Sequence, residues 1–163
     1  IQIEKSDVIQ DISAELENTK LPPEALIVEL TESALLEDNS NARHFLKELK
    51  KAGIRLALDD FGTGYSTMNM LKNQTLDEIK IDREFIRDLE KDKSRIIIRN
   101  TIAMLQQLGV HIVIEGVETE EQKSFLLGCG CTDAQGFLFH RPMPVEAFDA
   151  LLLQQECEYD RTK

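Results

Sequence analysis

The stretch "LALDDFGTGYS", residues 56–66, runs from an apolar segment into two adjacent aspartates and then into a turn that contains two glycines. A continuous apolar segment of this kind is typical of a strand that is buried on both faces, as in a parallel sheet. Asp59 and Asp60 cannot both point to one side of a regular strand, because successive side chains alternate between its faces. One of them can face the end of the sheet, and we expect the turn at Gly62 and Gly64 to bring the other round.

Four more apolar runs of strand length occur in the chain, and helical patterns alternate with them. The predicted strands cover residues 25–30, 54–60, 78–82, 110–116 and 134–139. The predicted helices cover residues 7–20, 39–53, 94–108, 119–128 and 144–155. This alternation predicts an α/β fold with a parallel sheet covered by helices. A doubly wound sheet and a (β/α)₈ barrel both fit, although five units are three strands short of a barrel, which usually has about 250 residues.

The composition limits the classes of partner. The 163 residues carry a formal net charge of -11, with a sequence pI of about 4.7. Such an acidic chain argues against a nucleic-acid polymer or an anionic membrane as the main partner. A small anionic substrate is compatible with this charge if metal ions neutralise the site.

Three further features bear on the location of the protein. The longest apolar stretches are far shorter than the roughly 20 residues of a membrane span, and the first ten residues, "IQIEKSDVIQ", do not form a signal peptide. The chain has three cysteines, Cys129, Cys131 and Cys157, and no two of them form a C-x-x-C pair. Neither a disulfide framework nor a zinc site is therefore predicted. We expect a cytoplasmic location and no membrane contact by this segment, although upstream segments could anchor the whole protein.

Polar side chains stand at or near the ends of all five predicted strands. Ligands of parallel α/β folds bind at the carboxyl ends of the strands, so these positions are candidates for a site. Contact with solvent explains any one such residue, but it explains five successive strands poorly. The residues are Glu29, Asp59, Asp60, Lys80, Asp82, Glu115 and Gln135.

The chemistry of this set predicts a metal site. Several carboxylates that converge around one lysine repel each other, or take up protons, unless a cation lies among them. Oxygen ligands without clustered His or Cys suit magnesium or manganese better than zinc. Two such ions about 3.5–4 Å apart are a common arrangement for phosphodiester hydrolysis. A nearby lysine could orient the attacking water or stabilise developing charge.

Five ordered motifs resemble those of one known family. They are "ELTES" (29–33), "DDFGTGYS" (59–66), "KID" (80–82), "EGVET" (115–119) and "QGF" (135–137), the last followed by "RPMP". The chain is similar to the EAL-domain family of bacterial cyclic-di-GMP phosphodiesterases over essentially its whole length. The resemblance implies a TIM-like barrel, of which this chain supplies about five strand–helix units. It also implies metal-dependent hydrolysis of cyclic-di-GMP to linear pGpG.

The resemblance implies a set of metal ligands that hold Mg²⁺ or Mn²⁺, as two ions. These ligands are Glu29, Asp59, Asp60 and Glu115.

It also implies roles around the metals. Lys80 contacts the nucleophilic water and Asp82 supports the site, while Glu115 acts at the second metal or as general base. Gln135 lies near the metal-bound water. Glu32 anchors the loop after Asp60, which in the family couples substrate binding, metal binding and dimerisation, so a homodimer through this region is expected.

The family's signature Glu-Ala-Leu and an asparagine metal ligand lie upstream of "ELTES" and are not in the chain. The letters "EAL" at 24–26 are a coincidence in the turn before the first strand. Residues 1–163 are therefore predicted to be the C-terminal portion, about two thirds, of a single EAL-type barrel domain. The parent protein is expected to be an active phosphodiesterase and the fragment alone inactive. The alternative is a non-catalytic EAL-like domain that binds cyclic-di-GMP or a protein partner.

Overall fold

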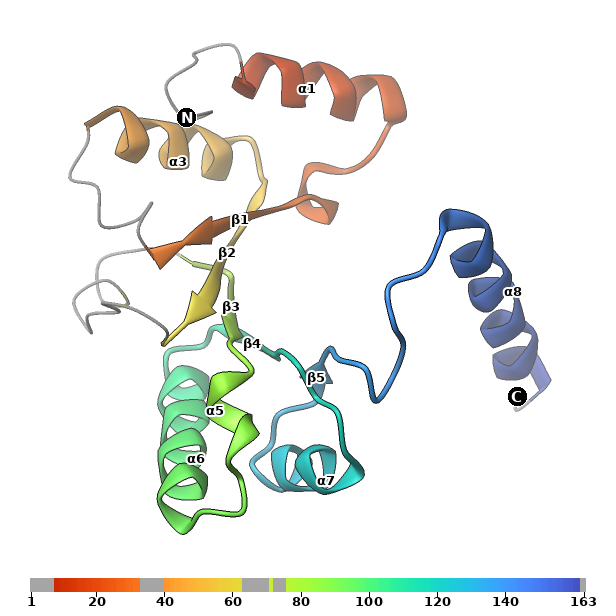
Figure 1. Ribbon diagram of the computed structural model, residues 1–163. Coiled ribbons are helices and arrows are strands. Elements are labelled where there is room, and N and C mark those ends of the chain that lie inside the picture. Colours follow the sequence, from red (N-terminus) through yellow and green to blue (C-terminus); the bar gives the residue numbers. More distant parts are fainter. Residues whose placement is uncertain (1–7, 33–39, 63–70, 72–75, 162–163) are drawn as a thin grey trace.

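The computed structural model describes residues 8–32, 40–62, 71 and 76–161 (Figure 1). Five strands of these residues form one sheet: β1 (Ile27–Thr31), β2 (Arg55–Phe61), β3 (Glu78–Ile81), β4 (His111–Ile114) and β5 (Asp133–Ala134). The helices are α1 (Val8–Thr19), the 3₁₀-helix η1 (Pro23–Ala25), α3 (Ser40–Lys51), α5 (Glu84–Arg87), α6 (Asp92–Gln107), α7 (Glu120–Gly128) and α8 (Val145–Arg161).

The strand order decides between the two folds that the sequence left open. The five strands lie side by side in chain order, and every neighbouring pair is parallel. A doubly wound sheet contains a point at which the strand order reverses, whereas a (β/α) barrel adds each strand beside the previous one. The described sheet has no such reversal, which confirms the α/β fold of the TIM-like barrel type.

Two apolar clusters hold the helices against the sheet. The first packs Leu30 of β1 and Leu56 of β2 against α1 and α3. The second packs β2, β3 and β4 against α5, α6 and α7 (Figure 1). Helix α6 contributes three fully buried side chains to it, Ile98, Ile102 and Leu105, whose spacing of four and three residues places them on one helix face. Burial of each stabilises the fold by about 1.5–3 kcal/mol relative to exposure.

The alternation of side chains along β3 places its isoleucines and Lys80 on opposite faces of the sheet. Ile79 and Ile81 are fully buried in the second cluster, and Lys80 between them belongs to the opposite face of the sheet. Leu58 of β2 and Ile114 of β4 belong to the same cluster as these isoleucines. The residues that follow them in sequence, Asp59 and Glu115, meet Lys80 on the opposite face.

The fifth strand was predicted too long. Strand β5 ends at Ala134, and residues 137–139 form a turn. The cause is a close approach at Gly136, where a Cβ atom would lie 2.2 Å from the carbonyl oxygen of Val117. The N–H of Leu138 also donates to that oxygen, at 3.0 Å, so the chain folds over Val117 instead of continuing along the sheet.

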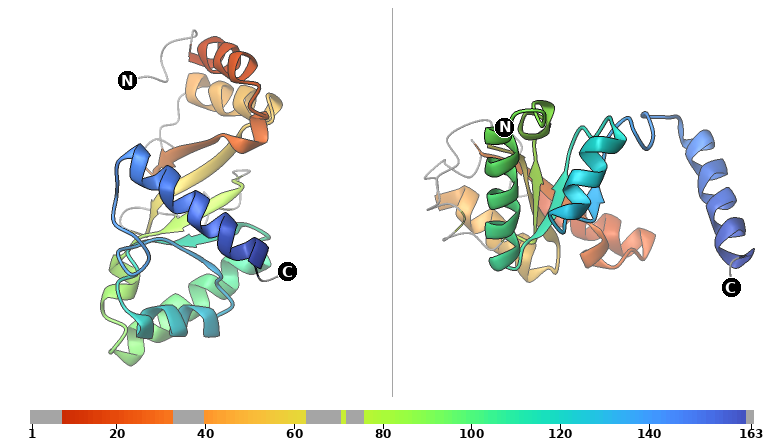
Figure 2. Two further views of the ribbon diagram at one scale, coloured as in Figure 1. Left: turned by 90° about the vertical axis from the view of Figure 1, so that its right-hand side faces the viewer. Right: turned by 90° about the horizontal axis from the view of Figure 1, so that it is seen from below.

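Helix α8 stands apart from the sheet at the end of the segment that follows β5, as Figure 1 and the right-hand view of Figure 2 show. Apolar side chains of this helix are partly exposed, among them Val145, Phe148 and Leu153. Among the described residues, no helix combines the length and the apolar character that a membrane span needs.

Candidate active site

Lys80 lies at the centre of a cluster of three carboxylates, two from other strands and one from the residue that follows β4. Its Nζ atom is 3.0 Å from Glu29 Oε1, 3.0 Å from Asp59 Oδ1 and 2.7 Å from Glu115 Oε1. Glu29 belongs to β1, Asp59 to β2 and Lys80 to β3, while Glu115 follows the last residue of β4. The structure therefore brings together four of the predicted site residues, in a cluster that we call the Lys80 cluster.

The electrostatics of the Lys80 cluster favour a bound cation. Burial by itself would lower the pKa of Lys80, but hydrogen bonds to Glu115, Glu29 and Asp59 outweigh it and raise the pKa above its ordinary value. The side chain is thus an ammonium group at neutral pH. One positive charge faces three carboxylates, so the cluster attracts further positive charge.

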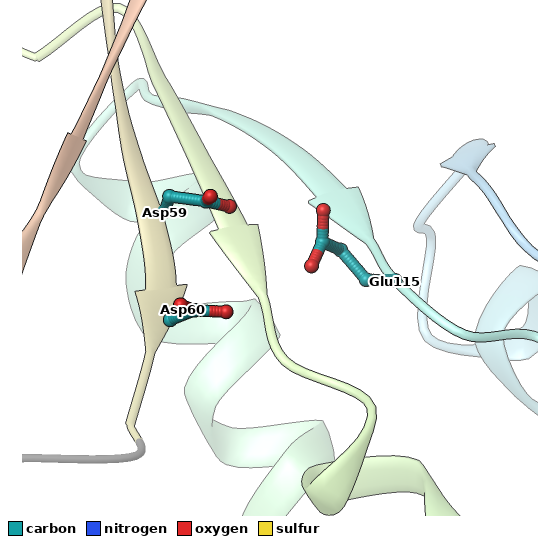
Figure 3. A group of neighbouring side chains, drawn as sticks. All are labelled: Asp59, Asp60 and Glu115. Atoms are coloured by element: carbon teal, nitrogen blue, oxygen red, sulfur yellow. The ribbon is translucent and has the colours of Figure 1, made fainter.

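Asp60 joins Asp59 and Glu115 through an unusual backbone conformation. Asp60 has a φ of 55°, and the pairing of β2 with β3 is irregular between Leu58 and Phe61. Carboxylate oxygens of Asp59, Asp60 and Glu115 then lie within 4.8 Å of one another. Figure 3 shows both aspartates extending from β2 toward Glu115. The predicted convergence of the two aspartates is present. It results from the irregular backbone at Asp60 itself, and the predicted contribution of Gly64 lies outside the described residues.

Glu32 contacts the backbone of Gly62, directly after β2. This buried carboxylate accepts a hydrogen bond from the N–H of Gly62 through Oε1, at 2.7 Å. Gly62 has a φ of 95°, and a Cβ atom there would lie 2.0 Å from Cε2 of the Phe85 ring. Position 62 therefore requires glycine. Its backbone conformation and its contacts with Glu32 and Phe85 define the path of the chain at the end of β2. The anchoring role of Glu32 stays a prediction, because residues 63–70 lie outside the described part of the chain.

Gln135 orients Glu115. Its Nε2 donates to Glu115 Oε1 at 2.5 Å, the same oxygen that contacts Lys80. The backbone of Gln135 is itself fixed, because its N–H donates to the carbonyl of Ile114 and its carbonyl accepts from the N–H of Val117. One carboxylate oxygen is therefore held from two sides, by Lys80 from β3 and by Gln135 at the end of β5.

Asp82 lies beside the Lys80 cluster and not within it. Its Oδ1 accepts a hydrogen bond from the N–H of Glu84 at 2.7 Å, at the start of α5. The carboxylate is thus used to begin a four-residue helix that the sequence did not predict. The structure does not include Asp82 among the described ion pairs of Lys80.

A cavity of about 630 Å³ opens beside Glu115 and Gln135. Asp82, Arg83 and Glu118 line one part of it, and the segment after β5 and the first half of α8 line another. The guanidinium group of Arg141 lies over the ring of Phe137, with 4.4 Å from its carbon Cζ to the ring centroid. The sequence interpretation did not single out Arg83 or the α8 side chains Phe148 and Leu151, because only the fold brings them to this cavity.

The comparisons with known proteins identify the family. The family model of the EAL domain matches residues 1–142, and the chain belongs to this family. It is 38% identical to the cyclic di-GMP phosphodiesterase RocR of Pseudomonas aeruginosa. The matched 148 residues cover 90% of this chain and 38% of RocR.

Two solved structures extend the comparison. The PaMucR phosphodiesterase in complex with c-di-GMP superposes with a TM-score of 0.81 at 39% identity, over 90% of this chain and 60% of that one. Klebsiella pneumoniae BlrP1 with manganese and c-di-GMP superposes with a TM-score of 0.79 at 35% identity, over 85% of this chain and 36% of BlrP1. The fold of the chain is thus that of EAL domains, and the chain spans less than two thirds of each of these relatives.

Proposed function

We propose that the protein containing this chain hydrolyses cyclic-di-GMP to linear pGpG in a metal-dependent reaction. The observation that carries the proposal is the Lys80 cluster, in which carboxylates from neighbouring strands face one ammonium group at the same end of the sheet. The names of RocR and PaMucR as phosphodiesterases of this family support the same chemistry.

The donor set fits a hard divalent cation. Three carboxylates with oxygens within 4.8 Å of one another offer oxygen ligands only, which suit Mg²⁺ or Mn²⁺. We propose Glu29, Asp59, Asp60 and Glu115 as ligands of two ions. When bound, the ions would supply a nucleophile at neutral pH and charge neutralisation on the phosphodiester.

The chain's own residues act on the water and on the developing charge. Lys80 carries three N–H donors and lies in a partly desolvated position, with a side chain only 10% exposed. We propose that it orients the attacking water and stabilises negative charge on phosphate oxygens. Glu115 acts at the second metal or as general base, and Gln135 keeps its carboxylate in place. Asp82 supports the wall of the site by fixing the start of α5.

We propose the adjoining cavity as the place of the substrate. Its volume of about 630 Å³ lies within the usual range of about 300–1,000 Å³ for ligand pockets. The half-exposed ring of Phe137 offers an aromatic surface to a flat base, and the Arg141 guanidinium beside it offers positive charge to a phosphate. The anionic substrate would thus meet cations at both the cavity and the metal site.

A homodimer is a separate proposal. The motif "DDFGTGYS" supports it, since in the family the loop after Asp60 couples the site to dimerisation. Residues 63–70 of this loop lie outside the described part of the chain. That residues 1–163 form the C-terminal portion of one EAL-type barrel domain, and have no activity alone, also stays a prediction.

Product analysis tests the proposed reaction. The full-length protein is incubated with cyclic-di-GMP and Mg²⁺ or Mn²⁺, and the products are separated by liquid chromatography. We expect pGpG with either metal and none after chelation with EDTA. Tight binding of cyclic-di-GMP with no product under any of these conditions would favour the non-catalytic alternative.

A further inference from the structure

We infer that Lys80 competes with the metal ions for the carboxylates of the Lys80 cluster and thereby weakens metal binding. The inference rests on the proposed function, because it concerns the same metal site. It adds a role for Lys80 that is exerted before substrate binds: the lysine sets the concentration of divalent cation at which the site is filled.

The competition follows from shared carboxylates. The ammonium group lies 3.0 Å from Asp59 Oδ1 and 2.7 Å from Glu115 Oε1. Both residues belong to the trio whose carboxylate oxygens converge within 4.8 Å. An ion bound to this trio would share Asp59 and Glu115 with Lys80, so the two cations would repel each other and divide the same negative charge.

The position of Lys80 makes the repulsion difficult to avoid. The residue is flanked by Ile79 and Ile81, which are fully buried, so its backbone is fixed in the middle of the sheet. Its side chain is only 10% exposed, and solvent screens such a buried charge weakly.

A purely organising lysine would have the opposite effect. If Lys80 only held the carboxylates in position, its removal would loosen the ligands and weaken metal binding. If Lys80 competes, its removal leaves three uncompensated carboxylates that attract a divalent cation more strongly. The sign of the change in affinity therefore separates the two roles.

The experiment measures Mn²⁺ affinity without substrate, from the electron paramagnetic resonance signal of free Mn²⁺. It compares the full-length wild type with Lys80→Met, which removes the charge, and with Lys80→Arg, which keeps it. Lys50→Met is the matched control, since Lys50 pairs with Asp77 outside the cluster. We expect Lys80→Met to bind Mn²⁺ about tenfold more tightly, as one cation removed from such short range predicts. Lys80→Arg and Lys50→Met should bind like the wild type.

A second measurement, on the wild type, tests the inference if the Lys80→Met variant does not fold. The ammonium ¹⁵N–¹H resonance of Lys80 in the wild type should shift on addition of diamagnetic Mg²⁺, while that of Lys50 should not. Unchanged or weaker Mn²⁺ binding by folded Lys80→Met would overturn this inference and leave the proposed function standing. A Lys80 resonance that does not shift with Mg²⁺ would do the same. A wild type that binds neither ion would contradict the metal site of the proposed function as well.

Discussion

Gln135 and Lys80 donate to the same oxygen of Glu115, at 2.5 Å and 2.7 Å. Two donors, one from β3 and one from the residue that follows β5, hold this carboxylate in one orientation. Loss of Gln135 should therefore disturb the chemistry more than the fold. For Gln135→Ala we expect the rate constant kcat for cyclic-di-GMP hydrolysis to fall about 10- to 100-fold, as for other residues that orient a metal ligand. Steady-state kinetics measure this, and a change confined to KM would contradict it.

The backbone at Asp60 predicts a contrast between two substitutions. A φ of 55° disfavours residues with a Cβ atom by about 1–2 kcal/mol, and glycine adopts it freely. Asp60→Gly and Asp60→Ala remove the same carboxylate, so they differ mainly in backbone strain. We expect Asp60→Gly to be the more stable variant by about 1 kcal/mol in urea denaturation. Equal stabilities would show that the bulge carries no such strain.

Gly62 should tolerate no side chain. The Cβ atom of Gly62→Ala would overlap the Phe85 ring, and the cost of overpacking of this kind is typically about 1–3 kcal/mol. Gly109→Ala is a suitable control, because Gly109 also has a positive φ, of 71°, but nothing lies within 4 Å of an added Cβ atom. Thermal denaturation of both variants separates overlap from backbone strain. The account fails here if the two variants lose equal stability.

The stability of the fold should depend on the protonation of His111. Its Nδ1 lies 3.0 Å from Glu78 Oε2, and its Nε2 lies 3.3 Å from Asp133 Oδ2. The hydrogen bond to Glu78 raises the pKa of His111, against the effect of burial, and Asp133 raises it further. Since the pKa is higher in the folded state, this contribution is complete below the unfolded pKa of about 6.5 and is lost as pH rises through the folded pKa.

Urea denaturation between about pH 5.5 and pH 8.5 tests this pH dependence. The wild type should lose stability through that window, whereas His111→Gln should lose less. His140→Gln is the control, because His140 lines the cavity and takes no part in the described ion pairs of Glu78 and Asp133. Parallel pH profiles for wild type and His111→Gln would rule out the proposed role of His111.

Much of the fold was predictable because the strands are coded by local pattern. Apolar runs before Asp59 and around Lys80 predicted β2 and β3 within one or two residues. The end of β5 was not predictable, because it depends on the approach of Gly136 to Val117, 19 residues earlier in the chain. Helix α5 escaped prediction for a similar reason: four residues carry no helical period, and the Asp82 carboxylate that starts it was interpreted as part of the site.

The candidate site was predictable as a set of residues but not as an arrangement. Strand ends of a parallel sheet meet at one edge, so Glu29, Asp59 and Glu115 were expected together. Their convergence around Lys80 was expected as well, but the individual contacts at 2.7–3.0 Å depend on strand register and side-chain direction, which the sequence does not state. The bulge at Asp60 is likewise a property of the folded backbone.

The central claim is that the strand-end carboxylates support metal-dependent hydrolysis of cyclic-di-GMP. The most direct measurement is the rate of pGpG formation by the full-length wild type and by its Asp59→Asn variant, with EDTA and after Mn²⁺ is restored. Asp88→Asn, which alters an exposed ion pair with Lys91, is the control. We predict turnover that Mn²⁺ restores in the wild type and in Asp88→Asn, with a loss of at least about 100-fold in Asp59→Asn. Undiminished turnover by Asp59→Asn, or full wild-type turnover in EDTA, would contradict the account.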